Sequence, residues 1–283
     1  MSDLRRPGSG YGAPRLGPKA DEGEDVRLPA KPGRAGRPGL SLRAVLPNAI
    51  TAAALCAGLT GIRFAVVGDW RMAMLCVVLA GVLDAMDGRI ARLLNAQSRF
   101  GAELDSLADS ASFGMAPAII LYLWVLQDLP RFGWLAALAY AICCALRLAR
   151  FNAQIDADEQ PHKSAGYLTG IPAPVGAGLV FLPVFLWLAT GNDAFRQPLL
   201  AAIWAALIAF LMISSIATLS WGKMRPKPSV RLALIAFVAL IFAALIIEPW
   251  WTLTTICVGY LALMPWGVIG YGRVKRRRAA AAS

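Results

Sequence analysis

Apolar residues fill most of the chain after a polar N-terminal region, in runs separated by short polar segments. An α-helix needs about twenty mostly apolar residues to cross the hydrocarbon core of a bilayer, and several runs approach this length. The pattern therefore predicts an all-α fold, a polytopic membrane helix bundle of about eight transmembrane helices. The expected spans are 48–67, 70–93, 103–126, 133–153, 173–190, 198–219, 231–248 and 251–271.

The composition agrees with this fold class and marks the ends of the chain as different. Hydrophobic residues make up 58% of the 283 residues, and the mean hydropathy is +0.57. Residues 1–44 are instead rich in Gly, Pro and charge, which predicts a disordered basic cytoplasmic tail, followed by a short juxtamembrane segment before Pro47. The rest divides into a membrane core at 46–220, two additional transmembrane helices at 221–272 and a basic cytoplasmic tail at 273–283.

The basic residues indicate the orientation of the bundle. The formal net charge is +11, and Lys and Arg gather before residue 45 and at 89–99, 147–163, 223–231 and 273–278, while the alternate loops hold few. Cytoplasmic loops carry such an excess. We therefore expect an integral inner (cell) membrane protein with both termini on the cytoplasmic side. Charges spread over membrane-flanking loops favour contact with anionic lipids and exclude a nucleic-acid partner.

Four aspartates interrupt the second and third predicted spans: Asp84, Asp87, Asp105 and Asp109. A charged side chain at the centre of a membrane helix costs at least about 2.5–3.5 kcal/mol, so four carboxylates need compensating cations. Their helical offsets place each pair on one face, and a turn near 98–101 lets the two pairs face each other. Hard cations prefer oxygen ligands, so the cluster predicts two divalent cations, Mg²⁺ or Mn²⁺. The alternative is pairing with Arg89, Arg92 and Arg99 at a helix end.

The spacing within this region is the pattern D-x2-D-G-x2-A-R-x8-G-x3-D-x3-D, and it resembles the CDP-alcohol phosphotransferase family. The match runs through Asp84, Asp87, Gly88, Ala91, Arg92, Gly101, Asp105 and Asp109. The resemblance implies a six-helix membrane core and an enzyme that displaces CMP from a CDP-linked donor with an alcohol. It also implies that the aspartates hold two metal ions.

The resemblance further implies roles for individual residues. Asp109 becomes the base that takes the proton of the acceptor hydroxyl, in addition to being a metal ligand. The surface that binds cytidine diphosphate comprises Asp84, Gly88, Ala91, Arg92 and Gly101, with Asn48 and Thr51 as polar neighbours from the first span. Small residues at helical spacing leave room there for a ligand against the backbone.

Four flanking segments, at 46–51, 106–118, 145–152 and 170–177, resemble those of family members that use serine as the acceptor. They imply that the phosphatidyl group of CDP-diacylglycerol passes to L-serine in phospholipid biosynthesis. The serine carboxylate needs a cation. The candidates near the cytoplasmic end of the fourth span are Arg147, Arg150, Asn152 and Lys163, and the two arginines are equally placed to hold the lipid-side phosphate.

Two alternatives remain open from the residues alone. The same chemistry with glycerol 3-phosphate or an inositol phosphate as acceptor keeps the aspartates but needs further cations. A transporter also has apolar spans and buried acids, although the acids here cluster toward one side of the membrane and no inverted repeat is visible. The spans after residue 180 carry no recognisable chemistry, which leaves them as scaffold, lipid contact or the surface of a homodimer.

Overall fold

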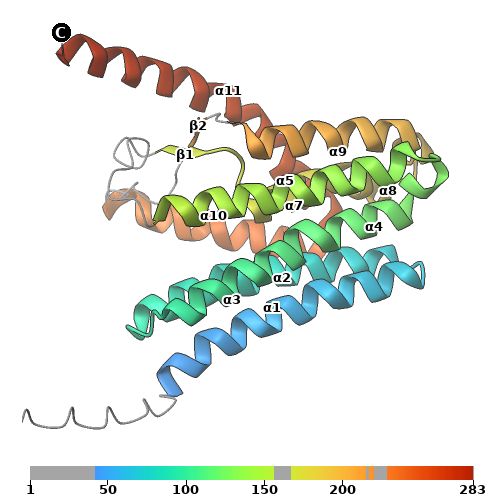
Figure 1. Ribbon diagram of the computed structural model, residues 1–283, viewed down its shortest axis with the longest axis horizontal. Coiled ribbons are helices and arrows are strands. Elements are labelled where there is room, and N and C mark those ends of the chain that lie inside the picture. The colour runs from blue at the N-terminus through green and yellow to red at the C-terminus, as the bar shows by residue number, and fades with distance from the viewer. Residues whose placement is uncertain (1–41, 156–166, 215–216, 220–227, 283) are drawn as a thin grey trace, which may run out of the picture. The chain divides into compact units, whose positions relative to one another are not determined.

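The computed structural model describes residues 42–155, 167–214, 217–219 and 228–282, and this part of the chain is almost entirely helical (Figure 1). The elements in chain order are α1 Leu42–Val66, α2 Trp70–Leu93, α3 Arg99–Asp109, the π-helix η1 Ser110–Met115, α4 Ala116–Trp124, the 3₁₀ turn η2 Leu126–Asp128, α5 Phe132–Ile155, β1 Tyr167–Thr169, α7 Ala173–Val180, α8 Leu182–Thr190, the 3₁₀ turn η3 Asp193–Phe195, α9 Pro198–Ile213, β2 Ala217–Leu219, α10 Pro228–Ile247 and α11 Pro249–Ala282.

The prediction of a helical membrane protein is confirmed at this level. In the described part of the chain, three helical stretches are long and apolar enough to cross a bilayer, namely Val45–Val66, Arg99–Trp124 and Phe132–Ala153. A fourth arises if α7 and α8, which meet at 43°, form one bent span. The count of about eight spans and the six-helix core stay predictions. The strands β1 and β2 pair antiparallel, with Leu168 opposite Thr218, and were not foreseen.

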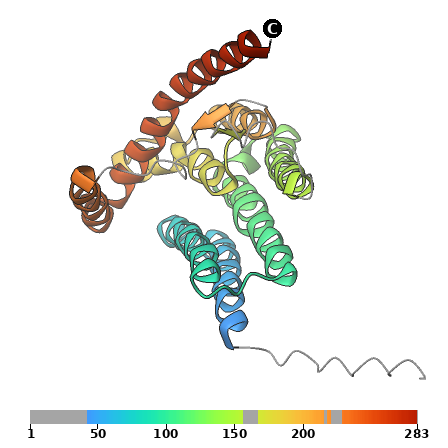
Figure 2. The same ribbon diagram turned by 90° about the vertical axis from the view of Figure 1, so that its left-hand side faces the viewer.

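Small residues set how closely the first helices approach one another. α1 and α2 form the most extensive helix pair, and Figure 2, which looks roughly along the helices, shows them side by side next to α3 and α4. A Cβ added to Gly61 on α1 would lie 3.1 Å from the Ala73 carbonyl oxygen on α2. In membranes, where lipid is as apolar as the side chains, such close backbone packing drives helix association. α5 and α9 form the other large contact.

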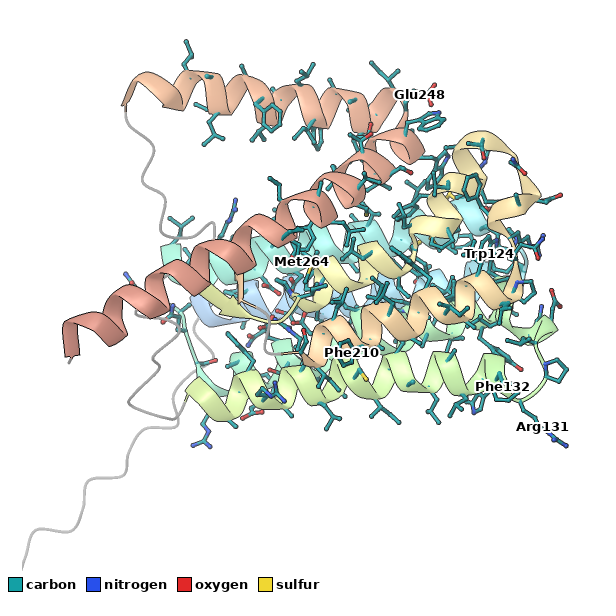
Figure 3. The ribbon with its side chains drawn as sticks, turned by 90° about the horizontal axis from the view of Figure 1, so that it is seen from above. Trp124, Arg131, Phe132, Phe210, Glu248 and Met264 are labelled. Atoms are coloured by element: carbon teal, nitrogen blue, oxygen red, sulfur yellow. The ribbon has the colours of Figure 1, made fainter. Side chains whose placement is uncertain are left out.

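α10 lies apart from this core and packs mainly on α11. Its apolar side chains project outward along its length, and Figure 3 shows the helix joined to α11 beside Glu248. Leu232, Ile235 and Phe242 are among the exposed large apolar side chains of this helix. Such a surface suits lipid contact, because acyl chains solvate apolar side chains without cost.

Two local predictions were wrong. The turn expected at 98–101 lies earlier: α2 ends at Leu93, Asn95 adopts a left-handed conformation with φ 49°, and α3 begins at Arg99. Ser98 is the N-cap of α3, because its Oγ accepts a 3.0 Å hydrogen bond from the backbone N–H of Gly101. The segment before Pro47 is also no separate element, since α1 runs from Leu42 through this proline. Residues 1–41 lie outside the described residues.

Candidate active site

The aspartates come from two consecutive helices joined by a short loop. Asp84 and Asp87 lie in the second half of α2, while Asp105 and Asp109 lie one turn apart on α3. Asp84, Asp105 and Asp109 are half-buried, and each offers a carboxylate oxygen within 4.8 Å of those of the other two. Three of the four predicted carboxylates therefore converge, as the helical spacing required.

Asp87 lies outside this group of three and is held by α1. The Thr51 hydroxyl donates a 2.6 Å hydrogen bond to Oδ2 of Asp87. Both side chains are buried, with 5% and 4% of their surface exposed. Asp87 still lies near enough to interact electrostatically with Asp105. The first predicted span thus contributes a polar side chain directly to the acidic cluster.

The surface of α2 beside these carboxylates is open. A Cβ built on Gly88 would meet no atom within 4 Å, and Gly88 is exposed. One turn later, Ala91 is half-buried, and the exposed Arg92 donates from Nε to the Gly88 carbonyl oxygen at 2.9 Å. A ligand can therefore approach the backbone of α2 here, with a guanidinium at the edge of the approach.

Two further predicted residues lie beside each other at the start of α3. A Cβ added to Gly101 would lie 2.9 Å from Oδ1 of Asn48, so only a glycine leaves the Asn48 side chain undisturbed at this point. The contact joins α1 to α3, as the hydrogen bond of Thr51 joins α1 to α2. Asn48 is half-buried, and its polar amide lies near the start of α3, the helix that carries Asp105 and Asp109.

The candidate residues for binding the acceptor differ in their burial and in their hydrogen-bond partners. Arg147 on α5 is half-buried, interacts electrostatically with Asp109, and has a buried Nε without a hydrogen-bond partner among the described residues. Arg150 is exposed, and its Nη1 donates a 2.9 Å hydrogen bond to the Ile213 carbonyl oxygen at the end of α9. Asn152 donates from Nδ2 to Oγ of Ser106, 2.8 Å away. Lys163 lies outside the described residues.

Sequence reasoning missed two side chains that shape this site. Ser106, next to Asp105, accepts the hydrogen bond from Asn152. Tyr140 on α5 donates from its hydroxyl to the Phe113 carbonyl oxygen in η1, directly after Asp109 in the chain. Ser106 lies within a segment noted for its resemblance, but Tyr140 is 27 residues from its partner and gives no local signal.

The cluster has the donor set of a divalent metal site. Three carboxylates within 4.8 Å of one another, all half-buried, repel one another strongly unless a cation or a shared proton lies between them. The alternative partners Arg89, Arg92 and Arg99 are exposed, and Arg92 donates to a backbone carbonyl. Oxygen-only ligands suit Mg²⁺ and Mn²⁺. The residues present therefore fit a hard divalent cation better than an ion pair.

A family model described as CDP-alcohol phosphatidyltransferase matches residues 44–216, which contain the whole acidic cluster. The chain belongs to this family. A second model, described as CDP-alcohol phosphatidyltransferase 2, matches residues 230–265 on α10 and α11. Members of the CDP-alcohol phosphatidyltransferase family are membrane enzymes that use divalent metals, in agreement with the apolar helices and the carboxylates described above.

Individual relatives of the family are similar over between about a third and four fifths of the chain. A Mycobacterium tuberculosis protein is 37% identical over 233 residues, covering 82% of this chain and 81% of the relative. A Helicobacter pylori protein is 35% identical over 202 residues, covering 70% and 81%. A Saccharomyces cerevisiae protein is 42% identical over 107 residues, covering 37% and 38%. Each of these relatives is named CDP-diacylglycerol–serine O-phosphatidyltransferase.

Proposed function

We propose that the protein transfers the phosphatidyl group of CDP-diacylglycerol to L-serine, giving phosphatidylserine and CMP. The observation that carries the proposal is the similarity to CDP-diacylglycerol–serine O-phosphatidyltransferases, which extends over 82% of this chain and 81% of the Mycobacterium tuberculosis relative. The family's aspartate pattern is complete within the shared region. Serine as the acceptor is thus supported independently of the acidic cluster, which the whole family shares.

The donor is held by the acidic cluster and the open surface of α2. Asp84, Asp87, Asp105 and Asp109 would hold two divalent cations, Mg²⁺ or Mn²⁺. When bound, they supply positive charge that stabilises the pyrophosphate and the leaving CMP. The cytidine diphosphate lies along Gly88, Ala91 and Arg92. The open space at Gly88 supports this assignment.

Asn48, Thr51 and Gly101 border the same surface from α1 and α3. Two observations support a shared role in shaping the nucleotide site. A Cβ added to Gly101 would lie 2.9 Å from Oδ1 of Asn48, and Thr51 donates a hydrogen bond to Asp87. In this arrangement, Thr51 orients Asp87 and Asn48 offers its amide to the nucleotide.

The transfer is an in-line displacement at the lipid-side phosphorus. The serine hydroxyl oxygen forms the new bond to phosphorus, the bond from phosphorus to the CMP oxygen breaks, and CMP departs. The hydroxyl proton passes to the carboxylate of Asp109, since a neutral hydroxyl is a poor nucleophile without a base within hydrogen-bond reach. The half-buried position of Asp109 beside Asp84 and Asp105 supports this role.

Arg147 is the residue that we assign to the carboxylate of serine. Two observations support this assignment: the buried Nε of Arg147 has no hydrogen-bond partner among the described residues, and the guanidinium interacts electrostatically with Asp109, the proposed base. Arg150 fits this role less well, because its Nη1 already donates to Ile213. Asn152 and Lys163 stay weaker candidates, Asn152 because its amide is engaged by Ser106.

In this proposal the site opens on the cytoplasmic side of the inner membrane, because serine is available in the cytoplasm. The support is the concentration of Lys and Arg in alternate loops. A dimer through the later helices stays a separate prediction.

The deciding experiment is incorporation of radiolabelled serine into chloroform-extractable lipid by purified protein in mixed micelles of detergent and CDP-diacylglycerol, with Mn²⁺ or Mg²⁺. We expect stoichiometric release of CMP with serine and none above background with glycerol 3-phosphate or inositol phosphate. Turnover with either phosphorylated alcohol, at rates equal to or above that with serine, would overturn the choice of acceptor and leave the family chemistry intact.

A further inference from the structure

A proline sets the backbone geometry directly after Asp109. Pro117 has no N–H, so the Phe113 carbonyl oxygen four residues earlier cannot receive the usual α-helical hydrogen bond, and the proline ring crowds this carbonyl. The helix accommodates this with the π-helical segment η1, in which the N–H of Ala116 bonds to the carbonyl of Ala111, five residues back. π-Helical turns occur often at functional sites.

Tyr140 supplies the missing donor from the neighbouring helix. Its hydroxyl donates a 2.9 Å hydrogen bond to the Phe113 carbonyl oxygen, and the side chain is 1% exposed. A buried carbonyl left without a donor is costly, so the hydroxyl holds η1 in its π-helical form.

The same face of α5 contacts η1 and the acidic cluster at successive turns. Tyr140, Cys144 and Arg147 follow at helical spacing. Cys144 lies against Gly114, where an added Cβ would be 3.2 Å from the Cys144 Sγ. Arg147 interacts with Asp109. One face of α5 therefore contacts η1 and also carries the arginine that interacts with the proposed base.

α1 holds η1 from another direction. Ser112 is buried and donates from Oγ to the Ala54 carbonyl oxygen at 3.4 Å. A Cβ added to Gly58 would lie 2.6 Å from the Ser112 Oγ. The π-helical segment therefore contacts α5 through Tyr140 and α1 through Ser112.

We propose that Tyr140 is a positioning residue, which fixes the rotation of α3 and thereby places Asp109 and Asp105 opposite Asp84. Asp105 and Asp109 precede η1, and α4 follows it. Conversion of η1 to an α-helix changes the relation between the two parts by one residue, or about 100° of rotation. The carboxylates of α3 would then turn away from α2. The reaction that these carboxylates serve rests on the proposed function, whereas the geometry of η1 and the carboxylates does not depend on it.

The test removes the hydroxyl alone, with Tyr140→Phe. Tyr122→Phe is the matched control, because Tyr122 packs edge-on against Trp134 at 5.1 Å and lies on α4 beyond the π-helix. Three quantities are measured on purified protein: Mn²⁺ affinity without substrate, from the electron paramagnetic resonance of the free ion; kcat and KM; and the apparent Tm in detergent.

We expect Tyr140→Phe to weaken Mn²⁺ binding and to lower kcat, each by at least about fivefold, the scale of one lost hydrogen bond. KM for serine should change less than kcat, and Tyr122→Phe should behave as wild type. Mn²⁺ affinity and kcat of Tyr140→Phe within twofold of wild type would overturn the proposal. If wild type binds Mn²⁺ but shows no serine-dependent turnover, the proposed function fails while the Mn²⁺ comparison still decides the role of Tyr140.

A double variant separates positioning from simple stabilisation. Tyr140→Phe with Pro117→Ala returns an N–H to position 117, which can donate to the Phe113 carbonyl in a regular α-helix. We expect the apparent Tm to recover toward wild type while Mn²⁺ affinity and kcat stay low, because the helix loses its π-helical turn. Recovery of Mn²⁺ affinity and kcat together with the Tm would show that Tyr140 only satisfies a carbonyl. This variant also decides the question if Tyr140→Phe alone does not fold.

Discussion

Thr51 on α1 donates a 2.6 Å hydrogen bond to Oδ2 of Asp87 on α2, and both side chains are buried. The bond crosses between the two helices with the most extensive contact in the described fold. It fixes one oxygen of the carboxylate and leaves the other oxygen available for a cation. Thr51 on α1 thereby sets the orientation of the Asp87 carboxylate on α2.

Thr51→Val should therefore impair the enzyme without changing side-chain shape. The variant removes the hydroxyl that donates to Oδ2 of Asp87, and a hydrogen bond to a charged group is worth about 1.5–3 kcal/mol. We expect kcat/KM for CDP-diacylglycerol to fall about tenfold or more, since each 1.4 kcal/mol is about a factor of ten. Thr51→Ser keeps the hydroxyl and is the control. Equal losses in both variants would show that the methyl group, not the hydrogen bond, matters.

Removal of divalent metal should abolish CMP release. Excess chelator leaves the converging carboxylates of Asp84, Asp105 and Asp109 without a countercharge. Activity in excess chelator would contradict the metal site.

Asp109→Asn should separate substrate binding from turnover. We expect turnover to fall at least about 100-fold, the usual scale of losing a general base, while most binding of CDP-diacylglycerol is retained. Loss of donor binding together with turnover would make Asp109 chiefly a ligand.

The spacing of the aspartates was sufficient to predict much of this site. Offsets of three and four residues place each pair on one helix face, and the loop between them brings the two faces together. The end of α2 at Leu93 agrees with the expected span 70–93, but the start of α3 was misplaced. Ser98 and Gly101 have the composition of a turn, while the serine is in fact the N-cap that starts α3. Caps and turns use the same residue types, so local sequence does not separate them.

Contacts between distant segments were beyond sequence reasoning for a different reason. Arg147 and Arg150 lie three residues apart on α5 and looked equivalent, but Ile213 at the end of α9 engages only Arg150. The partnership of Tyr140 with Phe113 depends likewise on how α5 packs against η1. Pro117 was the one local sign that a carbonyl in this helix needs an outside donor.

Gly58→Ala should destabilise the contact between α1 and η1. The added Cβ would lie 2.6 Å from the Ser112 Oγ and 2.9 Å from its Cα, so the helices must move apart. Overpacking of this kind costs about 1–3 kcal/mol. We expect a lower apparent Tm in detergent. Gly259→Ala on α11 meets no atom within 4 Å and should leave it unchanged. An unchanged Tm for Gly58→Ala would contradict the close packing.

Cysteines at positions 97 and 192 should react from opposite sides of the membrane. The span Arg99–Trp124 has 26 residues, about 39 Å of helix. Gln97 lies at its beginning, while Arg196 donates to the Trp124 carbonyl oxygen at 3.1 Å and holds the loop of Asn192 at its end. In a background without the five native cysteines, an impermeant thiol reagent should label Asn192→Cys in intact cells and Gln97→Cys only after permeabilisation. Labelling of both in intact cells would contradict this topology.

The two arginines of α5 give the last prediction, because the structure makes one a matched control for the other. Serine is a small zwitterion whose carboxylate needs one cation, whereas a phosphorylated alcohol needs several. Arg147 has a buried Nε without a described partner beside Asp109, while Arg150 donates to Ile213 and is exposed.

Arg147→Ala should therefore raise KM for serine about tenfold or more, since a charge-assisted hydrogen bond is worth about 1.5–3 kcal/mol. Arg150→Ala should leave this KM within about twofold of wild type, because a surface substitution costs little. Initial rates at varied serine and fixed CDP-diacylglycerol, then the reverse, separate the two constants. A rise confined to KM for CDP-diacylglycerol would reassign Arg147 to the lipid-side phosphate. Equal effects of both substitutions on KM for serine would contradict the division of roles, because only Arg147 lies beside the base that the serine hydroxyl must reach.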